Sequence, residues 1–381
     1  MNQEYLNKIR DIQDHLIELI ENQFANDNDI NIFTGFLQDQ KISKNQHELK
    51  DFLHLILKIS NHHYHPPDFY DKIEKILTFM KKEILKYFTN NQIFNIFHNN
   101  KRILLFLFEE KFIEPNRTIA LTITDEKYRN LRYPEYFYPE FKTIFNELIE
   151  KDRIKYKQIE EITKEINKKY PKIDNEKRKV GENDDFICQI IRKDSANEFI
   201  DYINRNNCLV TANINSSIYE THPYLINKDL TLIEYSAFFG AVQIMKYLYH
   251  QSIILSPSLW IFAIHGSNPA LIHLLEENKI KPSIEVYQQC FLEAVKCHHN
   301  DIANYIESNF LLPQNPINES TIFLQAINYH NFTYFSDDAT IDFDVFYALC
   351  ENDYYLFVED FLKESSLNLN LKKIIFKFFF S

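Results

Sequence analysis

Apolar residues recur at steps of three and four positions along most of the chain. Such spacing places their side chains on one face of an α-helix. Residues 47–60 and 69–88 repeat the pattern, and 91–97 with 101–113 predict a helical hairpin. Near the start of the chain the same pattern gives one apolar face, made of Leu6, Ile9, Ile12, Leu16, Leu19 and Ile20. Because only 117–125 (RTIALTITD) suggests a strand, we predict an all-α protein.

The pattern changes between about residue 131 and residue 184. Prolines interrupt YPEYFYPE, and the following stretch is rich in Lys and Glu. We predict a charged helix and a linker over 131–184, with the run EKRKV at 176–180 exposed to solvent. The predicted domains are an N-terminal helical domain, the charged segment, a repeat region and an apolar tail or cap: 1–130, 131–184, 185–365 and 366–381.

The second half of the chain repeats itself. TLIEYSAFFGAVQIMKYL (231–248) matches SLWIFAIHGSNPALIHLL (258–275) at an offset of 27 residues (271 − 244). QCFLEAVKCHHNDIANYI (289–306) continues the series at an offset of 31 residues (302 − 271). Fainter copies cover 185–203, 321–332 and 345–362, and the second helix of the copy at 321–332 decays into FSDD.

Each copy predicts a short helix, a tight turn and a second helix. Small residues such as Ala237, Ala263 and Ala294 recur in one column and would let neighbouring first helices pack closely. One such unit cannot bury its apolar face alone, so the copies are expected to stack into a solenoid.

These columns resemble the ankyrin repeat. The matching residues, in order, are Thr231, Ser236, Ala237, Gly240, Gln243, Ile244 and Leu248. The opening Thr-Pro-Leu-His of that repeat is replaced by TLIE and SLWI, and the spacing is shorter than the usual 33 residues. We therefore expect simple loops in place of its projecting β-turns.

Longer phrases are similar to a large ankyrin-repeat family of trichomonad protists, whose N-terminal portion is a domain of unknown function. They are NKRILLFLFEEKFI, VGENDDFICQIIRKD, LTLIEYSAFFG and KCHHNDIANYI. The resemblance covers nearly the whole chain. It implies an interaction protein and supplies no catalytic residues.

Charge and cysteine content narrow the class of protein. The formal net charge is −12 with no basic block, so we expect no nucleic-acid partner. Five cysteines without a Cys-x-x-Cys pair are typical of a reduced, cytoplasmic protein. The longest strongly apolar runs are far shorter than the roughly 18 residues of a membrane-spanning helix.

The four glycines exclude the common phosphate-binding loops. Gly35, Gly181, Gly240 and Gly266 lie too far apart to form one loop, whereas a phosphate cradle needs clustered glycines. No Gly-x-Ser-x-Gly motif occurs either. We expect neither an enzyme nor a bound cofactor.

One histidine-rich loop keeps a metal site open as the alternative. NHHYHPP places His62, His63 and His65 together before two prolines, and three imidazoles could bind zinc. No matching Cys or His pair follows at zinc-finger spacing, so we favour a loop between helices. A metal-dependent enzyme or metal-binding protein using residues 62–65 is the rival hypothesis.

The stretch CHHND (297–301) could be a catalytic Cys–His pair, a metal site or a turn. In the repeat register His298 takes the turn-glycine column. Asp301 begins the second helix, where an anion suits the helix dipole. The sequence places no third orienting residue beside this stretch. We therefore interpret it as a turn between two helices.

Three residues are candidates for partner binding. Phe238 and Phe239 precede Gly240 where the ankyrin consensus is usually polar, and His265 is the third candidate. They could cover an adjacent loop or the N-terminal domain, or form an exposed patch that anchors a partner. We predict a non-catalytic adaptor that binds a protein through the open face of the stack and its loops.

Overall fold

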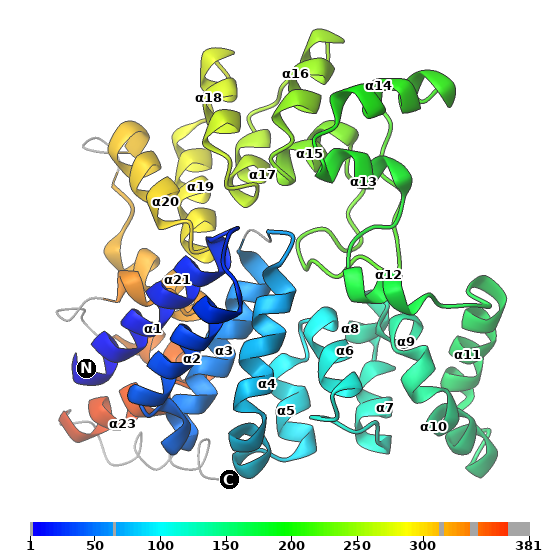
Figure 1. Ribbon diagram of the computed structural model, residues 1–381, viewed down its shortest axis with the longest axis vertical. Helices are drawn as coiled ribbons and strands as arrows, with labels where there is room; N and C mark the ends of the chain where they lie inside the picture. The colour runs from blue at the N-terminus through cyan, green and yellow to red at the C-terminus, as the bar shows by residue number, and fades with distance from the viewer. Residues whose placement is uncertain (1–2, 64–65, 312–315, 336–341, 365–381) are drawn as a thin grey trace. The chain divides into compact units, whose positions relative to one another are not determined.

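Helices are the only regular elements that the computed structural model describes. It describes residues 3–63, 66–311, 316–335 and 342–364 (Figure 1). Within these ranges the one β-type pairing is an isolated bridge between Asn213 and Thr231. None of the helices described is both long and apolar enough to cross a membrane. The all-α prediction is confirmed.

The chain forms two compact units. Unit 1 combines Met1–Leu55 with Pro313–Ser381, and unit 2 is Ile56–Leu312. One of the two places where the chain passes between the units falls within helix α3 (Gln46–His62). This grouping differs from the four predicted domains, which stay predictions about separately folding parts. The apolar tail 366–381 lies outside the described residues.

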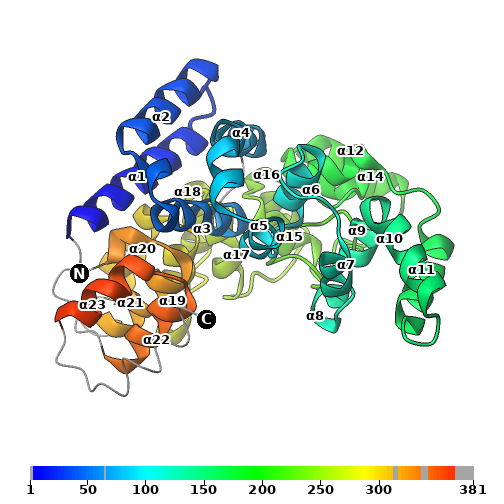
Figure 2. The same ribbon diagram turned by 90° about the horizontal axis from the view of Figure 1, so that it is seen from below.

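Unit 1 draws its helices from both ends of the chain. Gln13 of α1 ties the two ends together, because its amide donates to Thr333 Oγ1 at 2.9 Å and accepts from Phe332 N at 2.7 Å. Figure 2 shows α21, α22 and α23 grouped together. The elements are α1 (Gln3–Glu21), α2 (Asp27–Asp39), η1 (Ile42–Lys44), the first part of α3 (Gln46–His62), α21 (Glu319–Tyr329), η3 (Phe332–Tyr334), α22 (Phe343–Glu351) and α23 (Tyr355–Glu364).

The first half of unit 2 consists of short helices with polar caps. Thr89 and Gln92 form a capping box at the start of α5, and Asn100 caps α6 through Ile103 N. The predicted hairpin of α5 and α6 is present. The elements are α4 (Phe69–Tyr87), α5 (Asn90–Phe97), α6 (Lys101–Glu109), α7 (Arg117–Ile123), α8 (Glu126–Asn130), α9 (Tyr133–Tyr136), α10 (Tyr138–Lys151), α11 (Lys157–Lys169) and α12 (Asn175–Val180).

One sequence prediction in this half is wrong, and a second fails at one residue. The predicted strand at 117–125 is helix α7, because Asn116 caps it through Ile119 N and the buried Ile119 and Ile123 lie four residues apart. The run 176–180, predicted to be exposed to solvent, is exposed at four of its five residues and lies in helix α12. There Arg178 is only 1% exposed and forms an ion pair with Glu140 at 2.7 Å. A paired, buried arginine anchors this segment to α10.

Helix pairs occur at all six predicted repeat positions. Four follow one another in unit 2, in a row along one side of Figure 1, and the first helices α13, α15, α17 and α19 contact in succession. In unit 1 the pairs are α21 with the short η3, as the decayed copy predicted, and α22 with α23. The unit 2 elements are α13 (Phe186–Arg192), α14 (Ala196–Arg205), α15 (Leu232–Phe238), α16 (Val242–His250), α17 (Leu259–His265), α18 (Pro269–Glu277), α19 (Ile284–Lys296), α20 (Asn300–Ile306) and the π-helical turn η2 (Glu307–Leu311).

The turn inside each pair has the same backbone geometry. One residue takes a positive φ. In most pairs the N–H of the next residue donates a hydrogen bond to the carbonyl five residues earlier, as Ala241 N does to Ser236 O at 2.9 Å. Both features are typical of a Schellman-type helix end. The positive-φ residues are Asp194, Gly240, Ser267, His298, His330 and Asp353. The helix–turn–helix prediction is confirmed for the residues described.

Candidate functional site

The CHHND stretch forms the predicted turn. Helix α19 ends at Lys296, and Cys297 is its C-cap. His298 takes the left-handed conformation at φ 59°, and His299 precedes α20. The glycine column of the repeat is thus filled by a histidine that adopts the glycine-like conformation.

Cys297 nevertheless meets a histidine, and that histidine comes from the neighbouring pair. His265 is the last residue of α17, while Glu293 lies in the last turn of α19 and Cys297, the C-cap of that helix, follows four residues later. Ala263 and Ala294 are fully buried, which lets the two helices approach. The repeat register therefore places all three side chains at one junction.

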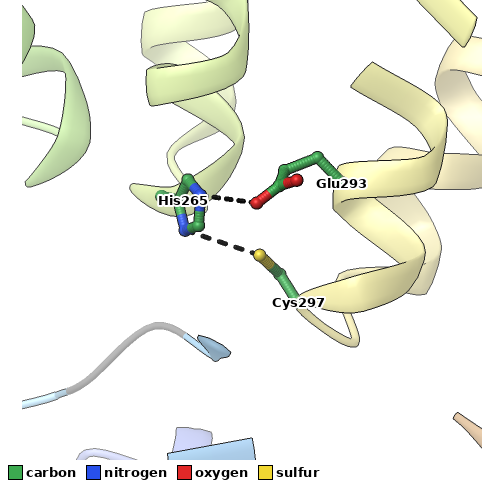
Figure 3. Close-up of side chains that lie close together, drawn as sticks. All are labelled: His265, Glu293 and Cys297. Atoms are coloured by element: carbon green, nitrogen blue, oxygen red, sulfur yellow. Dashed lines mark hydrogen bonds and ion pairs between the residues drawn. The ribbon is translucent and has the colours of Figure 1, made fainter. Parts of the chain in front are cut away.

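His265 stands between a carboxylate and a thiol (Figure 3). Its Nε2 lies 2.9 Å from Glu293 Oε1, and its Nδ1 lies 3.5 Å from Cys297 Sγ. Lys296 Nζ contacts the same Glu293 oxygen at 2.9 Å. One potential ligand atom from each of His265, Glu293 and Cys297 lies within 4.8 Å of the other two. Among the described residues no other group of three His, Cys, Asp or Glu side chains could hold a metal ion.

Burial sets the protonation states of this cluster. Burial, and then the charge of Glu293, hold the pKa of the Cys297 thiol well above its ordinary value. Burial also lowers the pKa of His265, although Glu293 opposes that shift. Burial alone would raise the pKa of Glu293, but contact with His265 and the charge of Lys296 bring it down to about 2. These shifts favour a thiol at Cys297 and a carboxylate at Glu293 at neutral pH.

Aromatic rings enclose His265. The Tyr224 ring lies 4.2 Å from the imidazole centroid, and Phe238 stacks on it at 4.9 Å. Phe238 also packs on Tyr224 and on His222, which belong to the loop before α15. Of the three candidate partner-binding residues, Phe238 and His265 are buried and Phe239 is half-buried. In this structure Phe238 covers an adjacent loop, one of the alternatives that the sequence left open.

The histidine-rich loop contributes a buried neighbour of this cluster. His63 Nδ1 donates to the Cys297 carbonyl at 2.8 Å, and its ring meets that of His299 at 4.8 Å. His62 is half-buried, and burial, together with the charge of Lys296, lowers its pKa. His65 lies outside the described residues. His62 and His63 do not belong to the three-ligand group described above.

The order thiol, imidazole, carboxylate is also that of a cysteine nucleophile with its base and orienting group. Such a nucleophile needs an accessible thiolate. Cys297 is 0% exposed, and its pKa is shifted upward, away from the thiolate. The same three donors can hold a metal ion, for which an exposed sulfur is unnecessary. Metal binding therefore suits this cluster better than nucleophilic attack.

The sequence analysis named His265 only as a candidate for partner binding and missed its contacts with Glu293 and Cys297. The signal was present in the repeat register: His265 lies two residues before its turn residue, and Cys297 one residue before the next. Reading neighbouring copies as packed first helices would have brought these columns together.

In comparisons with known proteins, no family model, no curated protein and no solved structure matches this chain. The resemblance to ankyrin repeats therefore rests on the residues quoted above, and the function is argued from the geometry of this chain alone.

Proposed function

We propose that this chain is a non-catalytic protein-interaction module whose helix pairs are degenerate ankyrin-like repeats stacked into a short solenoid. The observation that carries the proposal is a repeated, exposed loop position. Repeat proteins use such recurring loops and the open face beside them to bind partners.

The second helices of three successive pairs end alike. Asn207, Ser252 and Lys279 each take a positive φ. In each case the N–H of the next residue donates a hydrogen bond to the carbonyl five residues earlier. The bonds run from Cys208 to Ile203 at 3.0 Å, from Ile253 to Leu248 at 3.3 Å and from Ile280 to Leu275 at 3.0 Å. The chain therefore leaves α14, α16 and α18 in the same way.

The residue two positions after each positive-φ residue is exposed. Leu209 is 72% exposed and Ile254 is 89% exposed, and Lys281 takes the third place. Covering such exposed apolar side chains with a partner removes apolar surface from water, which stabilises the complex. We prefer Leu209 and Ile254 to Phe238 and Phe239 as contact residues. Phe238 is buried and Phe239 is half-buried, whereas both loop residues are exposed.

A capture experiment with matched variants tests this proposal. The baits are the wild-type chain, a Leu209→Ser/Ile254→Ser variant and an Ile154→Ser control, incubated with lysate of the source cells and read by quantitative mass spectrometry. Ile154 is 93% exposed but lies between α10 and α11, away from the helix pairs. Circular dichroism checks that every bait is folded.

We expect a protein that the wild type and the Ile154 control retain and the double variant loses. Equal recovery by all three baits would place binding away from these loops. Recovery of nothing specific by the wild type would contradict the adaptor function itself.

A further inference from the structure

We propose that His265, Glu293 and Cys297 bind one zinc-type transition-metal ion that clamps helix α17 to helix α19. This site is independent of the proposed partner-binding loops. The three donors come from two consecutive helix pairs, so a bound ion would join neighbouring repeats.

The donor set selects the class of metal. An imidazole nitrogen, a carboxylate oxygen and a sulfur are the three ligand types that Zn²⁺ takes in proteins. Ca²⁺ and Mg²⁺ prefer oxygen ligands alone, so His265 and Cys297 disfavour them. Imidazole with thiolate indicates zinc, or a close substitute such as Co²⁺.

The distances fit a tetrahedral ion at His265 Nδ1. Zinc bonds of about 2.0 Å to nitrogen and 2.3 Å to sulfur place two tetrahedral ligands about 3.5 Å apart. The Nδ1 to Sγ distance here is 3.5 Å. Glu293 now contacts the other ring nitrogen, so its side chain must change torsion to bring a carboxylate oxygen to the ion; the three ligand atoms already lie within 4.8 Å of one another.

Charge balance also favours a divalent ion. Binding converts the Cys297 thiol to a thiolate and releases one proton to solvent, so that the thiolate and Glu293 neutralise the two positive charges. His265 remains neutral, which is the form that coordinates metal. Lys296, which contacts Glu293 at 2.9 Å, opposes the ion by its charge. Removing that ammonium should tighten metal binding.

A small cavity borders one of the three ligands, His265, while Glu293 and Cys297 are not among its lining residues. It has a volume of about 30 Å³, and His63, His222 and His265 are among the residues that line it. A space of this size holds about one or two water molecules. The fourth coordination position would be taken by water, as in zinc sites with three protein ligands.

Cobalt titration tests the site, because a Co²⁺–thiolate bond absorbs in the near ultraviolet and reports sulfur coordination directly. Purified full-length protein, stripped with a chelator, is titrated with Co²⁺ and then with Zn²⁺. The variants are Cys297→Ser, Lys296→Gln and the control Cys290→Ser. Cys290 is a buried thiol on the same helix but outside the three-ligand group.

We expect one equivalent of Co²⁺ with a thiolate band in the wild type and in Cys290→Ser, and its displacement by Zn²⁺. Cys297→Ser should lose the band and bind more than about 100-fold more weakly, beyond what loss of an outer-shell partner causes. Lys296→Gln should bind more tightly than the wild type. If Cys297→Ser does not fold, His265→Gln takes its place, with the same expected loss. No thiolate band in the wild type, or a band that survives in Cys297→Ser, would overturn the proposal.

Discussion

Two successive junctions between first helices are built in opposite ways. Where α15 meets α17, the contact depends on missing side chains: Gly240 and Gly266 face each other, and a Cβ on Gly266 would lie 2.8 Å from Gly240 N. Where α17 meets α19, Cys297 stands in the column of Gly266 and joins His265 and Glu293. One repeated backbone thus supports close backbone packing at one junction and a polar cluster at the next.

This difference shows how a degenerate repeat diversifies. The turn geometry is kept, with positive φ at Gly240, Ser267 and His298, while the side chains beside it vary from aromatic to ionisable. Asn268 reinforces the glycine junction by donating to the Gly240 carbonyl at 3.0 Å. Ionisable side chains can therefore occupy one junction while the backbone of the neighbouring junction stays the same.

The largest expected effect is at the glycine junction. Gly266→Ala should lower the free energy of unfolding by about 3 kcal/mol or more, because the new Cβ would overlap backbone atoms of Gly240 and Ala237 that cannot rotate away. Urea unfolding followed by circular dichroism measures the change.

Gly35→Ala is the matched control with the opposite sign. Gly35 lies inside α2 and has nothing within 4 Å of an added Cβ. Alanine should therefore stabilise the helix by about 0.5–1 kcal/mol. A Gly266→Ala protein as stable as the wild type would show that the glycine junction is not closely packed.

The stability that the polar α17–α19 junction contributes should depend on pH. The pKa of Glu293 in the folded protein is about 2, below its ordinary value of 4.5. Its contribution is thus present above pH 4.5 and lost as the pH falls towards 2. Glu293→Gln should cost up to about 3 kcal/mol at pH 7, and this difference from the wild type should shrink at pH 3.

Unfolding curves of both proteins at the two pH values measure this effect, with the exposed Glu277→Gln as control. A Glu293→Gln deficit that is equal at pH 7 and pH 3 would mean that the carboxylate charge does not stabilise the junction.

The smallest stability effect is expected away from both junctions. Leu209→Ser/Ile254→Ser should change the free energy of unfolding by less than about 0.5 kcal/mol, because both side chains are exposed in loops. Thermal melting checks this. A large destabilisation would show that these residues pack in the folded chain and are not free to bind a partner.

The helices could be predicted because their apolar spacing is a local signal. The six helix pairs and the turn at His298 follow from repeated columns in the sequence. Helix α7 could not be recognised from its alternating β-branched residues, because the Asn116 cap and burial on one face outweigh that propensity. The burial of Arg178 depends on Glu140, 38 residues away, and no local pattern signals it.

The candidate site was predictable only in part for the same reason. His265 stands out within its own copy, but its contacts with Glu293 and Cys297 depend on how two helices pack. Likewise, Phe238 is buried because it packs on Tyr224 of the loop before α15. No periodic pattern in the sequence predicts the path of that loop. Tertiary packing determines which columns become a site.

Thermal unfolding with and without zinc tests most directly whether the α17–α19 junction is a metal clamp. The wild type and Cys297→Ser are melted in chelator and again in excess Zn²⁺. An ion that binds only the folded state raises the melting temperature. We predict that zinc raises the Tm of the wild type by several degrees and leaves that of Cys297→Ser unchanged. Equal shifts in both proteins, or no shift in the wild type, would contradict the account.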